Sequence, residues 1–423
     1  MKAVPTELQE LKEKYMVSVE EAIEAFRNGE MLILIDDEER EDEGDLVLAA
    51  EHVTPEKINF MITHGKGLVC VALTEERAQE LKLRPMVARN TALLNTAFTE
   101  SVDVIHGVTT GISAYDRAET VKALVDSNTR PEDLARPGHV FPLIAHPGGV
   151  IMRPGHTEAV VDLARIAGIA PAGVLCEIVD ENGTMAKLPS LLKLAEEFNL
   201  KVATVADIIR FRCQKETLIE KVTDVQLPTA YGDFQLYLFQ NRFNSQEHHL
   251  ALVKGDLRGE EPVLIRVHSE CLTGDTFGSL RCDCGDQLHH ALQQINKVGR
   301  GAVLYLKQEG RGIGLANKIL AYKLQDEGKD TVEANEALGF KADLREYWFA
   351  AQMLKELGVQ QVRLMTNNPR KVNDLEKYGI EVVERVPIII HPNPNNKHYL
   401  LTKGLKLGHF IEKSMLENGK DQQ

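Results

Sequence analysis

The pattern of apolar and polar positions over residues 1–205 alternates between short apolar runs and longer amphipathic segments. Ser18 precedes Glu21 by three residues, which is typical of a capping box, and the amphipathic helix that it begins is expected to end near Gly29. The wholly apolar run 31–35 predicts a buried strand. Further strands are predicted at 67–73 and 173–179, and helices at 157–167 and 191–198. This alternation predicts an α/β domain over residues 1–205.

The pattern restarts after residues 206–221, a helical turn followed by a charged segment that we expect to be a linker. Residues 225–239 alternate on either side of a Gly-Asp turn, which predicts a β-hairpin. Strands are predicted at 262–267, 302–306 and 362–366, with a helix near 287–297. Because no internal repeat relates the halves, the sequence predicts two unrelated mixed α/β domains with some α+β character, the second over 222–423.

Composition narrows the class of protein. A chain of 423 residues is long enough for two or three cores. It has no N-terminal apolar signal and no run of about 18 apolar residues, so we expect a cytoplasmic protein without membrane contact. The net charge of −14 argues against non-specific binding to nucleic acid. Three of the six cysteines form one cluster, which does not resemble a disulfide framework.

That cluster is the most informative chemical feature of the second half. Cys271, Cys282 and Cys284 lie within fourteen residues, and zinc binds thiolates readily. No fourth ligand follows at finger-like spacing, because the apolar rhythm around His289 and His290 predicts a helix face. A structural zinc site uses four protein ligands, whereas a catalytic site leaves one position for water or substrate. The spacing therefore favours catalytic zinc, and three unbound cysteines are the alternative.

The first half carries an acidic loop, residues 36–45, in which every residue except Gly44 is charged and Arg40 is the one cation. Most charge runs are solvated surface loops, which is the alternative here. This run, however, leaves the end of an apolar strand, where α/β proteins often bind ligands, and oxygen ligands suit Mg²⁺. Residues 153–157, Arg-Pro-Gly-His-Thr, form a plausible phosphate seat at a helix start. The string Arg-Pro-Gly-His also occurs at 136–139. Together they favour metal-dependent sugar-phosphate chemistry.

Three further clusters in the second half suit a phosphate-bearing ligand. Residues 266–270 directly precede the thiols, 309–314 are glycine-rich between a strand and a helix, and 366–371 place a proline at a helix start. Such segments combine free backbone N–H groups, a helix dipole and a lysine. The glycine spacing is not the dinucleotide fingerprint. Taken singly, each has an ordinary alternative as a turn or a helix cap.

Four strings of the first half closely resemble the 3,4-dihydroxy-2-butanone 4-phosphate synthase family over about residues 17–212: Asp-Asp-Glu-x-Arg-Glu-x-Glu-Gly-Asp, Arg-Pro-Gly-His-Val-Phe-Pro, Gly-His-Thr-Glu-Ala and Gly-Val-Leu-Cys-Glu. That family converts ribulose 5-phosphate to 3,4-dihydroxy-2-butanone 4-phosphate and formate with Mg²⁺ or Mn²⁺. The resemblance implies Glu41 and His156 as metal ligands, and His139 and Glu177 as catalytic residues. The substrate-binding residues that it implies are Arg40, Glu41, Asp45, Arg153, Pro154, Gly155, His156, Thr157 and Glu177.

The second half closely resembles GTP cyclohydrolase II over about 222–410. The strings are Arg-Val-His-Ser-Glu-Cys-Leu-Thr-Gly-Asp, Arg-Cys-Asp-Cys-Gly, Gln-Glu-Gly-Arg-Gly-Ile-Gly, Asp-Thr-Val-Glu-Ala-Asn and Thr-Asn-Asn-Pro. That family hydrolyses GTP to 2,5-diamino-6-ribosylamino-4(3H)-pyrimidinone 5′-phosphate, formate and pyrophosphate. The resemblance implies one zinc ion on Cys271, Cys282 and Cys284. The GTP-binding residues that it implies are Arg266, Val267, His268, Ser269, Glu270, Gln287, Glu309, Gly310, Arg311, Thr331, Thr366 and Lys371.

The same resemblance implies Asp343 as a general base and places Arg345 at the α-phosphate, as a nucleophile or as a stabiliser of charge. A guanidinium stays protonated in proteins, which favours the stabiliser. Together the halves resemble fused bifunctional riboflavin biosynthesis enzymes. The resemblance to each family implies a homodimer when that domain occurs as a separate protein, so we expect this chain to form a dimer. The alternatives are an enzyme with one inactive half and, more remotely, a zinc-containing nucleic-acid-binding protein.

Overall fold

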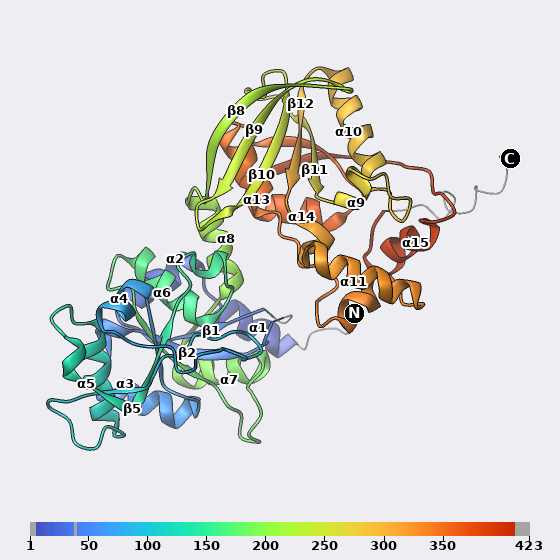
Figure 1. Cartoon of the computed structure of the whole chain (residues 1–423). Helices are drawn as coiled ribbons and strands as arrows, with labels where there is room; N and C mark the ends of the chain where they lie inside the picture. Colours follow the sequence, from blue (N-terminus) through green and yellow to red (C-terminus); the bar gives the residue numbers. More distant parts are fainter. Residues whose placement is uncertain (1–5, 38–39, 411–423) are drawn as a thin grey trace. The chain divides into compact units, whose positions relative to one another are not determined.

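The computed structural model describes residues 6–37 and 40–410 and divides the chain into two compact units after Arg212 (Figure 1). The boundary lies inside the predicted linker, residues 206–221, which the structure places in helix α8 (Val205–Lys215) and at the start of strand β8 (Ile219–Thr229). Leu218 and Ile219 are buried. The side chain of Gln352 binds the carbonyls of Cys213 and Glu216 and the amide of Leu218. Residues 213–221 therefore belong to the packing of the second unit.

The first unit is built on a seven-stranded mixed sheet with the order β4-β5-β3-β6-β2-β1-β7. Strand pairs β1–β7 and β3–β5 are parallel, and the other neighbours are antiparallel. The strands are β1 (Leu32–Ile35), β2 (Gly44–Ala49), β3 (Cys70–Leu73), β4 (Val102–Val104), β5 (Leu134–Ile144), β6 (Gly173–Glu177) and β7 (Lys201–Thr204).

Helices cover both faces of this sheet, because neighbouring residues of a strand point to opposite sides. Ile33 packs into one core with α1, α3, α5 and α7, whereas Leu34 packs into another with α2, α6 and α8. The helices are α1 (Thr6–Tyr15), α2 (Val19–Arg27), α3 (Pro55–Phe60), α4 (Glu75–Glu80), α5 (Ala114–Val125), α6 (His156–Ala167) and α7 (Leu188–Phe198).

The local predictions for this unit are confirmed with small shifts of boundary. Ser18 caps α2: its Oγ accepts from the Glu21 amide at 3.2 Å, and the Glu21 carboxylate accepts from the Ser18 amide at 2.9 Å. The predicted strand at 67–73 begins only at Cys70, because a helical turn continues to Gly65 and Lys66 adopts a left-handed conformation. The predicted strand at 173–179 ends at Glu177.

The second unit has another seven-stranded sheet, with the order β14-β13-β11-β12-β10-β9-β8. The predicted hairpin is confirmed by the pairing of Thr229 with Gly232. Strands β8, β9 and β10 form an antiparallel meander, and β12, β11, β13 and β14 run parallel. The remaining strands are β9 (Gly232–Asn241), β10 (Asn244–Lys254), β11 (Val263–Ser269), β12 (Gly301–Leu306), β13 (Gln361–Met365) and β14 (Glu381–Val386).

The three central parallel strands of this sheet place the site. The carboxyl ends of β11, β12 and β13 lead directly into residues 270–284, 307–314 and 366–371. Parallel strands bring such ends to one edge, so segments far apart in sequence meet there. The helices are α9 (Leu272–Asp275), α10 (Cys284–Val298), α11 (Gly314–Asp326), α12 (Thr331–Ala337), α13 (Trp348–Glu356), α14 (Pro369–Lys377) and α15 (Lys397–Lys406).

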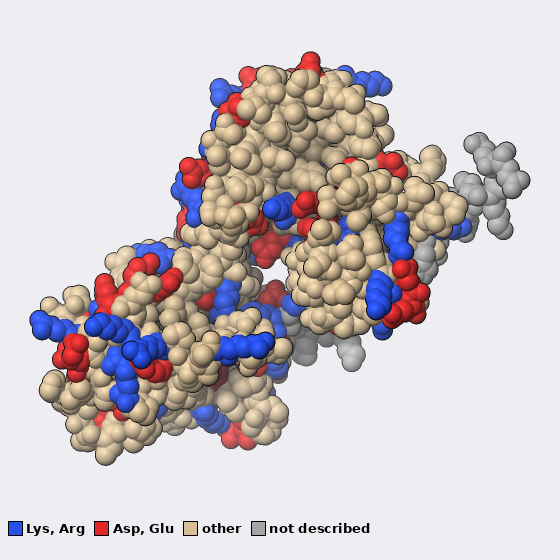
Figure 2. Space-filling model, viewed as in Figure 1, with Lys and Arg blue, Asp and Glu red and all other residues tan. Residues whose placement is uncertain are grey.

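On the face shown in Figure 2, Lys and Arg are interspersed with Asp and Glu and gather into no extended basic patch. The absence of nucleic-acid binding stays a prediction. None of the helices in the described ranges is both long and apolar enough to cross a lipid bilayer.

Two candidate active sites

A carboxylate-rich cluster lies where β1 and β2 meet the start of α6. Asp36 follows β1, Glu41 lies in the acidic loop, and His156 is the first residue of α6. One ligand atom from each lies within 4.8 Å of the other two. The Nδ1 atom of His156 is 3.9 Å from Oε2 of Glu41 and 3.8 Å from Oδ1 of Asp45. Residues 38 and 39 of the loop lie outside the described residues. The structure thus brings the two predicted metal ligands together and adds Asp36, which the sequence did not single out.

The electrostatics of this cluster suit a divalent cation. Burial raises the pKa of Asp45 well above its usual range, and the nearby charges of Glu177 and Glu41 raise it further. Burial lowers the pKa of His156, so its imidazole is neutral and has a lone pair for a metal. Crowded carboxylates beside a neutral imidazole repel one another, and a bound cation relieves that repulsion. The donor set of oxygens with one imidazole nitrogen fits Mg²⁺ or Mn²⁺.

Two guanidinium groups converge beside this cluster at the N-terminus of α6. Arg40 lies 2.7 Å from Asp36, and Arg153 lies 2.6 Å from Glu158. A Cβ atom added at Gly155 would lie 2.9 Å from a nitrogen of each arginine, so only glycine leaves this point open. Two cations and the free N–H groups of a helix start are an arrangement that suits the predicted phosphate seat. Pro154 and Thr157 flank this point, and Thr157 is buried.

The two predicted catalytic residues of this half lie differently. Glu177 pairs in register with Asp45 across β2 and β6, which places it next to the carboxylate cluster. Its Oε2 accepts a hydrogen bond from the Leu68 amide at 2.8 Å. His139, on β5, instead pairs with Asp103 through Nδ1 at 2.7 Å. Among the described residues, no hydrogen bond or ion pair joins His139 to that cluster.

The repeated string Arg-Pro-Gly-His has two unrelated roles. The second copy, at 153–156, leads into α6, and its Arg153 pairs with Glu158 at the predicted phosphate seat. In the first copy the guanidinium of Arg136 binds Glu100 at 2.8 Å and the carbonyls of Leu81, Pro131 and Leu134. The first arginine therefore holds neighbouring segments together through hydrogen bonds, a difference that identical strings could not reveal.

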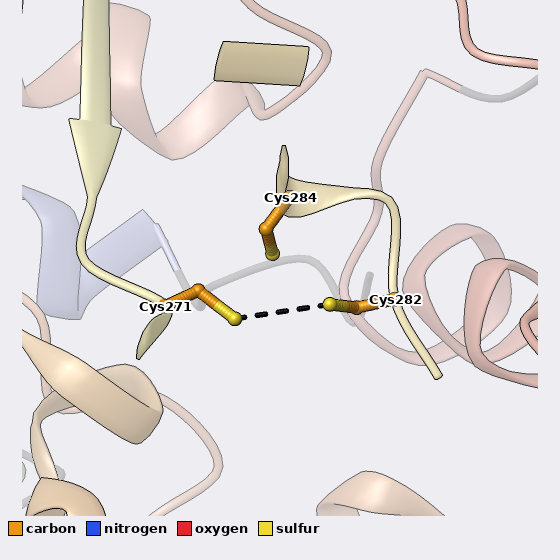
Figure 3. A group of neighbouring side chains, drawn as sticks. All are labelled: Cys271, Cys282 and Cys284. Carbon is orange, nitrogen blue, oxygen red and sulfur yellow. Dashed lines mark hydrogen bonds between the residues drawn. The ribbon is translucent and has the colours of Figure 1, made fainter. Parts of the chain in front are cut away.

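The three thiols of the second unit converge on one point (Figure 3). Cys271 follows β11, Cys282 lies in a loop, and Cys284 begins α10. Their sulfur atoms all lie within 4.8 Å of one another, and those of Cys271 and Cys282 are 3.7 Å apart. A Cβ atom at Gly274 would lie 2.9 Å from the Cys282 sulfur, so glycine is needed for this approach. The geometry leaves a three-sulfur donor set that fits zinc with an open fourth position.

A lysine that the sequence did not single out completes this cluster. The ammonium of Lys318, on α11, lies 3.2 Å from the Cys271 sulfur and 2.8 Å from Oε1 of Glu309. Hydrogen bonds from the two neighbouring thiols, and then the charge of Lys318, lower the pKa of Cys271. The hydrogen bond to Cys271 raises the pKa of Cys282 to about 11. Lys318 thus favours the thiolate form of Cys271, the form that binds metal. Lys318 lies too far along the chain for spacing to reveal it.

A cavity beside the thiols gathers nearly all the predicted nucleotide-binding residues. Those that line it are Arg266, His268, Ser269, Glu270, Gln287, Glu309, Gly310, Arg311, Thr331, Thr366 and Lys371, together with Arg345. Val267 is the exception, because alternation along β11 turns its side chain into the core. Only its carbonyl contributes, as the acceptor for Lys371 at 2.6 Å. Asp343 lies behind Arg345 and does not line the cavity.

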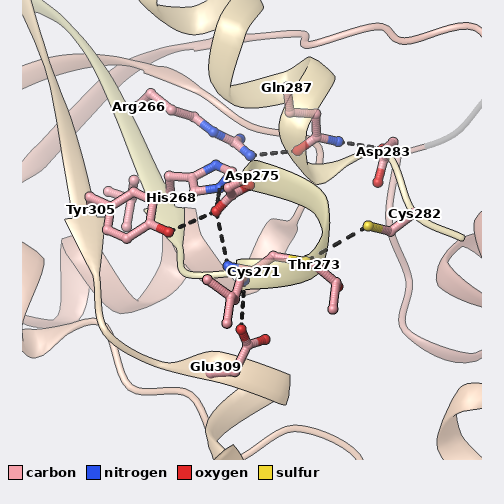
Figure 4. A network of polar contacts seen from close by, with 12 residues as sticks. Arg266, His268, Cys271, Thr273, Asp275, Cys282, Asp283, Gln287, Tyr305 and Glu309 are labelled. Atoms are coloured by element: carbon pink, nitrogen blue, oxygen red, sulfur yellow. Dashed lines mark hydrogen bonds and ion pairs between the residues drawn. The ribbon is translucent and has the colours of Figure 1, made fainter. Parts of the chain in front are cut away.

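A buried polar network holds the thiol loop against the sheet (Figure 4). The Asp275 carboxylate accepts from the Cys271 amide at 2.9 Å and from the Tyr305 hydroxyl at 2.8 Å. It also lies 3.1 Å from Nε2 of His268. On the other side of the loop, Glu309 accepts from the Leu272 amide at 2.6 Å. The loop that carries the first thiol is thus held by residues from the carboxyl ends of β11 and β12.

Two separate α/β units, one with an oxygen-rich cation pocket and one with a thiol-lined cavity, define an enzyme with two active sites. The family model of 3,4-dihydroxy-2-butanone 4-phosphate synthase matches residues 20–211, and that of GTP cyclohydrolase II matches residues 220–387. Riboflavin biosynthesis protein RibBA of Chlorobium phaeovibrioides is 56% identical over 95% of this chain and 98% of its own length. The Aquifex aeolicus protein of the same name is 56% identical over 96% of this chain and 100% of its own.

A solved structure supports the same family assignment. The crystal structure of RibBX from A. baumannii, a two domain 3,4-dihydroxy-2-butanone 4-phosphate synthase, is 37% identical, with a TM-score of 0.69 over 88% of this chain and 100% of that one. The chain therefore belongs to the family of bifunctional riboflavin biosynthesis enzymes that join a 3,4-dihydroxy-2-butanone 4-phosphate synthase, a lyase, to a GTP cyclohydrolase II, a hydrolase. Both resemblances found in the sequence are confirmed.

Proposed function

We propose that both halves are active, each with its own metal: Mg²⁺ or Mn²⁺ on Glu41 and His156, and one zinc ion on Cys271, Cys282 and Cys284. The observation that carries this proposal is that each unit has a complete donor set next to a phosphate-binding arrangement of cations. A half that had lost its activity would have no need to keep either. The sites share no residue, so the two reactions are expected to be independent.

In the synthase half, Arg40, Arg153 and the N-terminus of α6 hold the phosphate of ribulose 5-phosphate. When bound, the metal polarises neighbouring oxygens of the sugar. Glu177 and His139 then move protons during enolisation and the carbon shift. Asp45 pairs in register with Glu177 across β2 and β6 and so lies beside it. Asp103 holds Nδ1 of His139, which leaves Nε2 as the atom that exchanges a proton.

In the cyclohydrolase half, the cations of the cavity hold the triphosphate, and Glu270, Gln287 and Glu309 supply polar contacts for the rest of GTP. Cys271, Cys282 and Cys284 would hold the zinc ion, which would activate water for hydrolysis at C8 of guanine. Asp343, the general base that the resemblance implies, orients the Arg345 guanidinium by accepting hydrogen bonds from it on both carboxylate oxygens. Arg345 stabilises charge on the departing pyrophosphate.

We also infer a cytoplasmic homodimer. Six large apolar side chains between residues 86 and 115 are exposed in the single chain: Met86, Val87, Leu93, Ile105, Ile112 and Tyr115. A second copy would remove such surface from water. Light scattering of the purified protein tests the inference, and a monomer at micromolar concentration would contradict it.

The test of both activities is product analysis of the purified protein given ribulose 5-phosphate or GTP separately. Glu41→Ala is expected to lower formate release from ribulose 5-phosphate at least about a hundredfold, on the order of 3 kcal/mol of transition-state stabilisation, and to leave GTP turnover intact. Cys282→Ser is expected to abolish GTP ring opening and to leave the synthase near wild type. Each variant thus serves as the folding control for the other.

Three results would count against the proposal. Wild-type protein that turns over only one substrate would show one half to be inactive. Full synthase activity in Glu41→Ala would make the acidic loop a solvated surface. Equal loss of both activities in a folded variant would contradict independent sites.

A further inference from the structure

The C-terminal segment 396–410 lies beyond the residues that the cyclohydrolase family model matches, 220–387, yet it forms one wall of the cavity. It consists of α15 and the residues that follow it. Tyr399, Lys403, Leu407 and His409 line the cavity beside the predicted GTP-binding residues. The segment is therefore part of the site, although nothing assigns it a role.

One end of this segment is bound to the thiol loop. The Lys403 ammonium lies 2.8 Å from Oδ1 of Asp283, the residue between two of the thiols. The other oxygen of that carboxylate accepts from Gln287, whose own oxygen accepts from Arg266. A continuous polar chain thus joins α15 to the sheet. The side chain of Asn396, wholly buried, donates to the Cys282 carbonyl at 3.5 Å.

The other end is bound to the start of α12 and the end of β13. Lys406 pairs with Asp330 and, at 2.9 Å, with Glu333, the two residues of the α12 capping box around Thr331. The Phe410 amide donates to the Asn367 carbonyl at 2.8 Å. Segment 396–410 therefore spans three parts of the cavity wall, which fixes Lys403 and His409 facing inward.

The rest of the cavity lining carries an excess of positive charge, because its arginines and lysines outnumber its two carboxylates, Glu270 and Glu309. Arg266, Arg311, Arg345 and Lys371 belong to it, and Lys371 is buried. Burial and then the charges of Arg266 and Arg345 lower the pKa of Lys371 well below its usual range. The pKa of His409 is lowered to about 3 by burial and then by Lys403, Arg345, Lys371 and Arg311. Cations this crowded repel one another until a polyanion neutralises them.

We propose that segment 396–410 is a binding element for GTP in which Lys403 and His409 complete the triphosphate site and α15 covers it from solvent. The inference rests on the proposed cyclohydrolase function. GTP is the polyanion that the proposed reaction supplies, and its triphosphate can bridge Lys403 to the four other cations of the cavity lining. Asp283 keeps Lys403 in place until the nucleotide arrives.

Lys403→Ala tests this role directly. It is expected to raise the KM for GTP on the order of tenfold to a hundredfold, the loss of one charge-assisted contact, with a smaller effect on kcat. Lys403→Arg keeps the charge and should recover most of the affinity. Lys397→Ala, at an exposed position of the same helix, is the matched control and should behave as wild type. Zinc content and synthase activity should be unchanged in all three.

Two truncations provide a second measurement. A chain ending at Phe410 should keep its affinity for a non-hydrolysable GTP analogue, and one ending at Asn395 should lose it while retaining zinc. Wild-type affinity in both Lys403→Ala and the shorter chain would overturn the inference. Absence of GTP ring opening in wild-type protein would instead refute the proposed function, so the two failures are distinguishable. A loss of zinc in Lys403→Ala would also overturn the inference, because it would reassign Lys403 to the thiol loop.

Discussion

Arg345 lies along the carboxylate of Asp343, with its Nε 2.8 Å from Oδ1. Burial alone would raise the pKa of Asp343, but the charge of Arg345 and its hydrogen bonds more than offset this and lower it to about 2. The pair is thus fully ionised at neutral pH, and Asp343 fixes the plane of the guanidinium. A protonated group held in this way has no lone pair for attack on phosphorus.

Substitution of Arg345 separates the two proposed roles. Arg345→Lys keeps the charge but loses the planar fork, so some pyrophosphate release should survive, whereas Arg345→Ala should be far worse. Rapid quenching of wild type with α-labelled GTP supplies the direct measurement. Label attached to Arg345 would refute charge stabilisation, and its absence together with partial activity of the lysine variant would support it.

Lys318 should control zinc affinity without binding zinc. Lys318→Met removes the ammonium beside Cys271, so protons should compete better for the sulfur and zinc should bind on the order of tenfold to a hundredfold more weakly. The zinc affinity of Lys318→Arg should lie between those of the wild type and Lys318→Met. Competition with a chromogenic chelator measures the affinity, and turnover of ribulose 5-phosphate reports on folding. Unchanged zinc affinity in the methionine variant would leave Lys318 with a packing role only.

The position of a chain break should decide whether the second unit folds alone. A fragment beginning at Cys213 keeps the residues that bind Gln352 and the buried Leu218 and Ile219. A fragment beginning at residue 222 loses all of them and leaves the Gln352 amide buried without partners, at a cost of about 1–3 kcal/mol for each unmet group. Urea denaturation should show a lower midpoint for the shorter fragment. Equal midpoints would mean that residues 213–221 are a free linker after all.

Docking of α15 should weaken in acid. The pKa of His409 is lowered to about 3 in the docked state, whereas a solvated histidine titrates near 6.5. Between these values the undocked state binds more protons, so docking is favoured above pH 6.5 and weakens as pH falls towards 3, by up to about tenfold per unit. Hydrogen exchange of the α15 amides, corrected for their intrinsic exchange rates, measures how docking depends on pH. His409→Asn should abolish the part of the dependence between about pH 6.5 and 5, and an unchanged dependence in that range would assign it to another group. At lower pH, protonation of Asp283, Asp330 and Glu333, which pair with Lys403 and Lys406 of α15, also weakens docking.

The sequence by itself determined the local elements and the chemistry of each half. The Ser18 cap, the hairpin at Gly232 and the buried strand before Asp36 follow from short-range preferences, which operate without the rest of the chain. The three thiols and the acidic loop could be recognised for the same reason: their spacing is local, and long motifs around them identified both families.

Only the tertiary structure decided which distant residues join the three thiols and the acidic loop. Lys318 and Lys403 reach the thiol loop from helices far along the chain, which no spacing reports. Asp36 belongs to the acidic loop itself, but only the fold shows that it lies beside both Glu41 and His156. Strand alternation, set by register, turned Val267 inward although its neighbours Arg266 and His268 face the cavity. Packing likewise separated the two Arg-Pro-Gly-His strings, since identical residues take their role from what surrounds them.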